Sequence, residues 1–301
     1  MSRFSVQRVQ RLLVVGPMAV LLLNCCAGAL AKKLGNSAIH CRNNSMKFLS
    51  VLVLSLVVLT LNVAAVGEDK NSPAQNGSFI TLKQGDGREF RAFVAGPADA
   101  KAAILIVHDY VGIADATKQS VQRLGALGYR SVAVDLYGGK SATSHDGAVK
   151  LMQSLDGNAS SKILQAGLDY LKQPGRKLAT IGICMGGQES LNANLSDPEA
   201  VSASVIIYGF DFDQIDTRQL EKLKSTVLVI VGSEDSGAMQ AAIHFLSTMK
   251  EAKRPCEMFV YPGADHGYAQ PLFNEGKNYN SEAVRTTWVL VEDFLGGHLR
   301  P

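Results

Sequence analysis

The chain has 301 residues, 47% of them hydrophobic, which is enough to bury the core of one large domain or two small ones and argues against disorder. No Asp or Glu occurs in residues 1–67, which hold seven of the thirty basic residues, so 23 basic and 27 acidic residues remain for the rest of the chain. A mildly acidic body without a basic stripe gives no footprint for nucleic acid, and we expect no nucleic-acid partner.

Two apolar runs occupy the N-terminus, which we interpret as a leader over residues 1–66. The second run, 48–66, follows Met46-Lys47 and ends in small residues, as expected for a secretory signal peptide at 46–65. We therefore interpret Met46 as the start and expect an exported protein, periplasmic or secreted. The alternative is a membrane anchor, because an uncleaved run of this length is long enough to span a bilayer.

A polar segment rich in Asn, Ser, Gly and charged residues follows the leader at 67–77 and is typical of a flexible linker. The rest, 78–301, shows no internal repeat, and we expect it to form one folded domain.

Strand and helix signals alternate from residue 78 onward. A hairpin is expected first, with strands at 78–82 and 89–94 around a Gly-rich turn. Apolar runs predict further strands at 102–107, 131–134, 178–183, 201–208, 227–231 and 257–261. Apolar residues at helical spacing predict helices at 116–127 (with Asp115 as its cap), at 160–173, after residue 231, and at 284–295. This succession indicates an α/β fold, with helices on both faces of a doubly wound, mostly parallel sheet.

The segment Thr180 to Ser190, T-I-G-I-C-M-G-G-Q-E-S, runs from an apolar strand into a helix through a glycine-bearing turn. Cys184 stands at the apex, with Gly182 and Gly186 two residues to either side. This pattern indicates a nucleophile elbow, in which strand and helix pass too close for a β-carbon. The helix N-terminus also favours a thiolate at Cys184. The alternative is a small buried cysteine in a structural turn.

Polar residues at the carboxyl ends of the predicted strands suggest the partners of Cys184, because ligands bind at that edge of an open α/β sheet. Asp235 follows the strand at 227–231, and His266 follows the strand at 257–261. Nucleophile, acid and histidine in this chain order are typical of α/β-hydrolase triads. In such a triad His266 takes the thiol proton and returns it to the leaving group, while Asp235 fixes the imidazole tautomer.

Each assignment has an alternative. Asp235 is also a suitable helix cap, and its neighbour Glu234 is a second candidate acid. His266 also suits a turn, and His108, at the end of a strand close to the site, is the competing histidine. The remaining histidines fall in the leader or at helix and tail positions expected to be solvated; they are His40, His145, His244 and His298.

Five motifs carry a family resemblance: G-I-C-M-G-G around Cys184, D-L-Y-G-G from Asp135, Y-G at Tyr208, G-S-E-D ending at Asp235, and Y-P-G-A-D-H-G-Y from Tyr261. From about residue 78 to the C-terminus, the sequence resembles the dienelactone hydrolase family of α/β-hydrolases. The resemblance implies an α/β-hydrolase fold and a hydrolase with a cysteine nucleophile. It also implies a small-molecule ester or lactone substrate.

The resemblance implies further site residues. A family Glu that helps to generate the thiolate when substrate binds corresponds to Asp109, whose side chain is shorter. The oxyanion hole corresponds to the backbone N–H groups of Tyr110 and Met185. Tyr208 and Gln270 correspond to substrate-binding positions.

Two positions depart from the family pattern in a way that bears on the substrate. The family clamps a substrate carboxylate with two arginines, and the matching positions here hold Gly139 and Gln270. Lys140 is the neighbouring cation, although a solvated lysine is the simpler interpretation. Without a bidentate clamp an anionic lactone loses its main recognition element. We therefore expect a hydrolase of carboxylic esters, lactones or thioesters, and not a dienelactone specialist.

Two other function classes remain open at this stage: an inactive hydrolase fold that serves as a binding protein, and a thiol redox protein in which Cys256 resolves an oxidised Cys184. Only these two cysteines lie beyond the leader, and no metal-ligand spacing occurs. We expect no metal and no cofactor, a monomer or small homo-oligomer, and membrane contact only if the leader is uncleaved.

Overall fold

The computed structural model describes residues 76–209, 212 and 215–299. The predicted leader, its signal peptide or anchor, and all but the last two residues of the predicted linker lie outside these residues. Export and cleavage therefore stay predictions. Within the described residues, no helix combines the length and the apolar character that a bilayer crossing requires.

One eight-stranded sheet forms the centre of the domain, with strand order β1-β2-β4-β3-β5-β6-β7-β8. Its strands are β1 Ser78–Lys83, β2 Glu89–Ala95, β3 Ala102–Val107, β4 Arg130–Val134, β5 Lys177–Ile183, β6 Val201–Ile207, β7 Thr226–Gly232 and β8 Cys256–Tyr261. β1, β2 and β4 pair antiparallel, and every pair from β4 through β3 to β8 is parallel. The parallel carboxyl ends therefore meet at one edge of the sheet, where the polar loops were expected.

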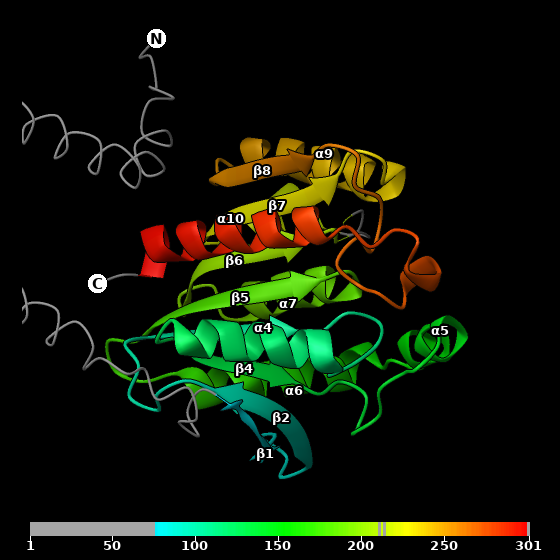
Figure 1. Ribbon diagram of the computed structural model, residues 1–301. Coiled ribbons are helices and arrows are strands. Elements are labelled where there is room, and N and C mark those ends of the chain that lie inside the picture. The colour runs from blue at the N-terminus through cyan, green and yellow to red at the C-terminus, as the bar shows by residue number, and fades with distance from the viewer. Residues whose placement is uncertain (1–75, 210–211, 213–214, 300–301) are drawn as a thin grey trace, which may run out of the picture. The chain divides into compact units, whose positions relative to one another are not determined.

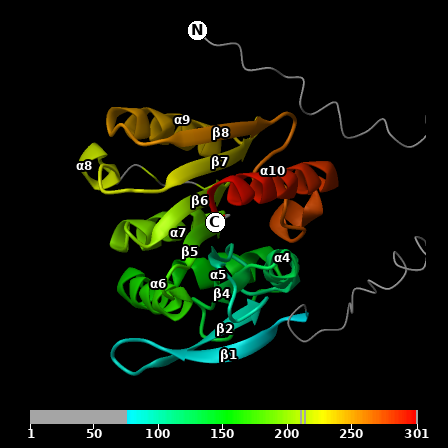
Figure 2. The same ribbon diagram turned by 90° about the vertical axis from the view of Figure 1, so that its left-hand side faces the viewer.

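Helices cover both faces of the sheet, as predicted (Figures 1 and 2). They are α4 Asp115–Ala126, α5 His145–Gln153, α6 Gly157–Leu171, α7 Met185–Ser196, α8 Thr217–Leu220, α9 Ser236–Glu251 and α10 Ser281–Leu299, with a 3₁₀ helix, η2, at Phe273–Gly276. α4 and α10 lie on one face, and α6, α7 and α9 lie on the other. This three-layer arrangement confirms the predicted doubly wound α/β fold.

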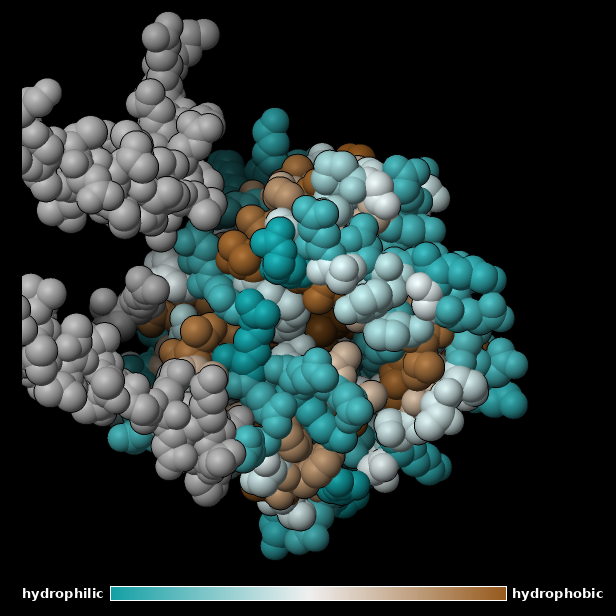
Figure 3. All heavy atoms as spheres, in the orientation of Figure 1, coloured by the Kyte–Doolittle hydropathy of each residue, from teal (hydrophilic) through white to brown (hydrophobic). Residues whose placement is uncertain are grey.

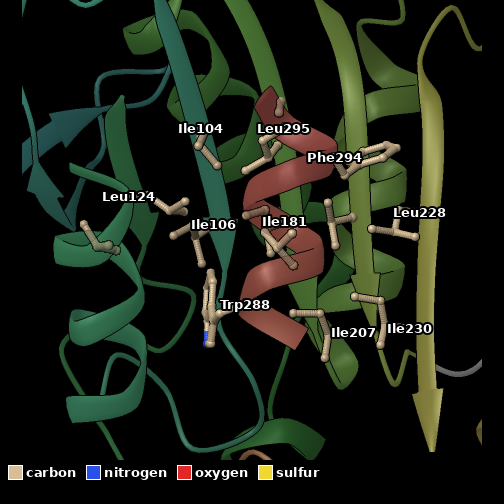
Figure 4. Close-up of a cluster of buried hydrophobic side chains, with 14 of the residues drawn as sticks. Ile104, Ile106, Leu124, Ile181, Ile207, Leu228, Ile230, Trp288, Phe294 and Leu295 are labelled. Atoms are coloured by element: carbon tan, nitrogen blue, oxygen red, sulfur yellow. The ribbon is translucent and has the colours of Figure 1, made fainter. Parts of the chain in front are cut away.

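Side chains alternate along each strand between two apolar cores. On β3, Ile104 and Ile106 pack under α4 and α10, whereas Leu105 and Val107 pack under α6. Trp288, Phe294 and Leu295 of α10 complete the first core (Figure 4). Because both faces of β3 are fully buried, its sequence is continuously apolar, which is the signal that identified it.

Three local predictions differ from the structure. Asp115 is not the cap of α4: Ala114 holds that position without a side-chain cap, and Asp115 lies in the first turn, where its charge suits the helix dipole. The short helices α5 and α8 were not predicted. α5 begins at Ser144, whose hydroxyl accepts from the Gly147 N–H, and a glycine in its first turn weakens the helical signal.

The nucleophile elbow is present between β5 and α7. Cys184 has φ 56° and ψ −124°, a conformation that side-chain-bearing residues rarely adopt. A β-carbon on Gly182 would lie 2.1 Å from the Gly186 carbonyl oxygen, and one on Gly186 would lie 2.5 Å from the carbonyl oxygens of Val107 and His108. The predicted need for small residues here is confirmed, since β3, β5 and α7 converge on this turn.

We predict that Gly182→Ala destabilises the protein by about 2 to 3 kcal/mol, because backbone atoms in its way must shift. Gly157→Ala, at the start of α6, is the matched control, since its β-carbon would meet no atom within 4 Å. Urea unfolding measures both. Equal stability of the two variants would mean that the elbow is looser than described.

Candidate active site

The carboxyl edge of the sheet brings together the three residues predicted as a triad. Cys184 Sγ lies 3.5 Å from His266 Nε2, and His266 Nδ1 lies 2.6 Å from Asp235 Oδ2. The three residues come from the loops after β5, β7 and β8. Both distances are those of hydrogen bonds, with the longer one appropriate to sulfur. The arrangement therefore allows a proton to move between the thiol and the imidazole.

Asp235 has both of the roles that its sequence position suggested: it caps a helix and it contacts His266. One carboxylate oxygen accepts from the Ala238 N–H at the start of α9, and the other meets His266. The cap fixes the carboxylate so that its second oxygen faces the ring. Glu234 is exposed and accepts from the neighbouring Ser233 hydroxyl, so the structure gives the candidate acid position to Asp235.

Cys184 is only 6% exposed. Burial, and after it the nearby charge of Asp109, raise the pKa of the thiol to about 12, although the backbone N–H groups of Met185 and Tyr110 act to lower it. The N–H groups at the helix N-terminus therefore favour a thiolate, as expected, but burial and a like charge outweigh the two donors. Those two N–H groups are nevertheless the ones predicted to form an oxyanion hole.

Asp109 and Gln270 form a buried hydrogen-bonded pair. Gln270 Nε2 donates to Asp109 Oδ2 at 2.6 Å, and the Val111 N–H donates to Oδ1 at 2.9 Å. Burial raises the pKa of the Asp109 carboxyl. The carboxyl is thus held by two donors, and its charge raises the pKa of Cys184. Its help in forming a thiolate when substrate binds stays a prediction.

His108, the competing histidine, has a structural role. Its Nε2 accepts from the Leu136 N–H at 3.2 Å, and its Nδ1 donates to the Asp109 carbonyl oxygen at 2.6 Å. Burial lowers its pKa, so the ring stays neutral and joins β3 to the loop after β4.

Aromatic rings surround the catalytic histidine candidate. The Tyr208 ring lies 5.4 Å from that of His266, and the Phe273 ring lies 5.1 Å away on η2. Phe273 in turn meets Tyr110 and His145, and the Tyr110 hydroxyl lies 3.2 Å from His145 Nδ1. His145 and Phe273 were missed in the sequence because no motif links α5 and η2 to the triad; the exposed ring of His145 had been expected to be solvated.

The two positions that match the family's arginines, Gly139 and Gln270, carry no charge. Gly139 lies in the loop after β4, and Lys140 beside it is exposed. The guanidinium of Arg91 on β2 lies near Gly139, where it stacks over the Phe79 ring at 4.0 Å. Arg91 is a cation near this loop that the sequence pattern did not indicate.

The strand register shows that Cys184 and Cys256 lie far apart. Cys256 is level with Val227 on β7, which is level with Ser204 on β6 and so with Thr180 on β5. Three strand spacings and four residues of rise place the two cysteines about 15 to 20 Å apart. A disulfide requires α-carbons within about 7 Å, so Cys256 cannot resolve an oxidised Cys184 in the same chain.

Comparison with known proteins agrees with this architecture. The model of the dienelactone hydrolase family matches residues 90–299. Pseudomonas putida carboxymethylenebutenolidase is 24% identical over 64% of this chain and 85% of its own length, and Protein usf of Aquifex pyrophilus is 28% identical over 74% and 99%. The crystal structure of a dienelactone hydrolase from Anabaena variabilis, 19% identical, superposes with a TM-score of 0.57 over 74% of this chain and 98% of that one, which shows the shared fold. Since the family model covers more than half of the residues, the chain belongs to the dienelactone hydrolase family.

Proposed function

We propose that this hydrolase cleaves carboxylic ester, lactone or thioester bonds through a covalent intermediate on Cys184. The observation that carries the proposal is the hydrogen-bonded chain from Cys184 to His266 to Asp235 at one edge of the sheet. The backbone N–H groups of Met185 and Tyr110 that act on the thiol are the proposed oxyanion hole.

The proposed reaction has two stages. His266 Nε2 takes the thiol proton, and the sulfur attacks the carbonyl carbon while the oxyanion accepts from the two N–H groups. The intermediate collapses, the C–O bond breaks, and the imidazolium gives its proton to the leaving alcohol. A water deprotonated by His266 then attacks the thioester, and the thiol is restored as the acid leaves.

Asp109 is proposed to set the charge state of the thiol. After burial, its charge is the main effect that opposes ionisation of Cys184, and its own pKa is raised by burial. Movement or protonation of this carboxyl would therefore favour the thiolate. Gln270, which holds the carboxyl, is placed to couple that change to an incoming substrate.

We predict that Cys184→Ala and His266→Ala each lower kcat by several orders of magnitude, and that the double variant is little worse, because the residues act as a unit. Asp235→Asn should lose less activity and keep the α9 cap, since Asn caps helices well, whereas Asp235→Ala should also lose about 1 kcal/mol of stability. Steady-state kinetics on p-nitrophenyl acetate with urea unfolding separates these effects. Full activity of a stable Cys184→Ala variant would show that Cys184 is not the nucleophile, whereas an inactive wild type would favour the binding-protein alternative.

We predict slow alkylation of Cys184 by iodoacetamide at pH 8, because a thiol with a pKa raised to about 12 holds little thiolate there. Asp109→Asn should accelerate this reaction about tenfold, the effect of lowering a pKa by about one unit. Asp115→Asn, at an exposed position, is the matched control. Mass spectrometry of the peptide that contains Cys184 gives the rate. A wild-type rate above that of free cysteine would contradict the resting charge state.

We predict that neutral small esters have a higher kcat/KM than carboxylate-bearing lactones of similar size. A charged clamp contributes roughly 1.5 to 3 kcal/mol, so its loss costs on the order of ten- to a hundredfold. A strong wild-type preference for the anionic lactone would instead assign its recognition to Arg91 or Lys140, which charge-removing variants would then test.

A further inference from the structure

A cavity of about 490 Å³ lies between α4 and α10, on the face of the sheet that these helices cover. Figure 3 shows a hollow with an apolar floor on this face. Its volume is within the range of small-molecule sites. The apolar part of its lining includes Ile183, Ile207, Ala269, Leu272, Val284 and Trp288. The wall formed by α4 is more polar and includes Gln119, Ser120 and Arg123.

The cavity adjoins the triad at its inner end. Ile183, which lines it, directly precedes Cys184, and Tyr208, which also lines it, packs its ring against His266. Asp109 and Gln270 complete this end. Asp109 therefore borders the cavity and also acts on the Cys184 thiol, so the Asp109–Gln270 hydrogen bond stands between the apolar space and the nucleophile.

A second observation points to a ligand. The Tyr208 side chain is 1% exposed, and its hydroxyl lies within reach of the Ala269 N–H as a donor. Among the described residues, no group accepts the phenolic proton. Buried polar groups are rarely left unsatisfied, and such groups in native structures commonly mark sites of function.

We propose that this cavity receives the acyl group of the substrate, which makes the protein selective for neutral esters whose medium-length acyl chain is largely apolar and carries one acceptor oxygen. This inference rests on the proposed function. A chain attached at the carbonyl carbon enters between Ile183 and Tyr208 as the Gln270 amide leaves Asp109. An acceptor oxygen on the chain binds the Tyr208 hydroxyl.

The position of the leaving group assigns the cavity to the acyl group and not to the alcohol. The departing oxygen takes its proton from His266 Nε2, so the alcohol lies against that ring. His266 does not line the cavity, but it contacts Phe273, which continues into the cluster of Tyr110 and His145. The alcohol therefore occupies the side of the site with Phe273, and the cavity is left for the acyl chain.

The test fills the cavity from either wall and measures kcat/KM for p-nitrophenyl acetate and octanoate. Val284→Phe fills it from α10, and Ala116→Leu fills it from α4. Val289→Phe is the matched control, because Val289 lies on α10 but is 51% exposed and outside the cavity. We expect both filling variants to lower the octanoate-to-acetate ratio at least tenfold, and the control to leave it unchanged. Melting temperatures confirm that the compared variants are folded, and the two walls give independent readings if one variant is unstable.

A second measurement tests the role of the Tyr208 hydroxyl. Octanoate is compared with analogues that carry one ether oxygen at successive chain positions. At one position we expect Tyr208→Phe to lower the ether-to-octanoate ratio by about three- to tenfold, the usual value of a single hydrogen bond. Equal ratios at every position would overturn the assigned hydrogen bond.

The outcomes separate this inference from the proposed function. If Cys184→Ala still hydrolyses the acetate ester, the proposed nucleophile is wrong. If acetate hydrolysis requires Cys184 but the octanoate-to-acetate ratio is the same in the wild type, both filling variants and the control, the nucleophile stands and the cavity assignment is overturned. Filling effects confined to a series of alkyl acetates, which vary the alcohol instead, would also overturn the acyl assignment.

Discussion

The strained backbone at Cys184 is the constraint on which the rest of the site depends. A residue at φ 56° is costly, by about 1 to 3 kcal/mol, and persists only where its surroundings determine it. Here the surroundings are the contacts of Gly182 and Gly186 with backbone atoms, together with the hydrogen bond from the Cys184 N–H to the Ile207 carbonyl oxygen. These contacts hold the sulfur at the edge of the sheet, opposite the loop that carries His266.

A nucleophile in this position experiences opposing electrostatic effects. The two backbone donors stabilise negative charge on the sulfur, but they are outweighed by burial and by Asp109. The same donors are more effective for an oxyanion, because that charge appears only during the reaction and does not have to be maintained at rest. A thiol with a raised pKa is thus compatible with the proposed catalytic role, because thiols react with alkylating agents and oxidants mainly as thiolates.

The fold was largely predictable from the sequence because its signals are local. Continuous apolar runs such as β3 identify strands buried on both faces, and glycines at fixed spacing around Cys184 identify the elbow. The contacts of Asp109 with Gln270 and of Tyr110 with His145 join segments 161 and 35 residues apart, and no local pattern encodes them. The balance of effects on the Cys184 thiol could not be predicted for the same reason: the helix terminus is visible in the sequence, whereas burial and the neighbouring carboxyl arise only from packing.

Gln270 links the loss of a substrate-binding arginine to the electrostatics of the Cys184 thiol, because it is hydrogen-bonded to Asp109. An arginine at this position would place a positive charge against Asp109 and cancel much of its effect on the thiol. Glutamine donates a hydrogen bond to the same carboxyl without supplying charge, so the negative charge still acts on Cys184. Glutamine at this position therefore removes one of the two cations for an anionic substrate and leaves the Asp109 charge, together with burial, to oppose ionisation of the thiol. A neutral substrate suits this arrangement, because an anion would add a second negative charge beside Asp109, and that charge would oppose formation of the thiolate.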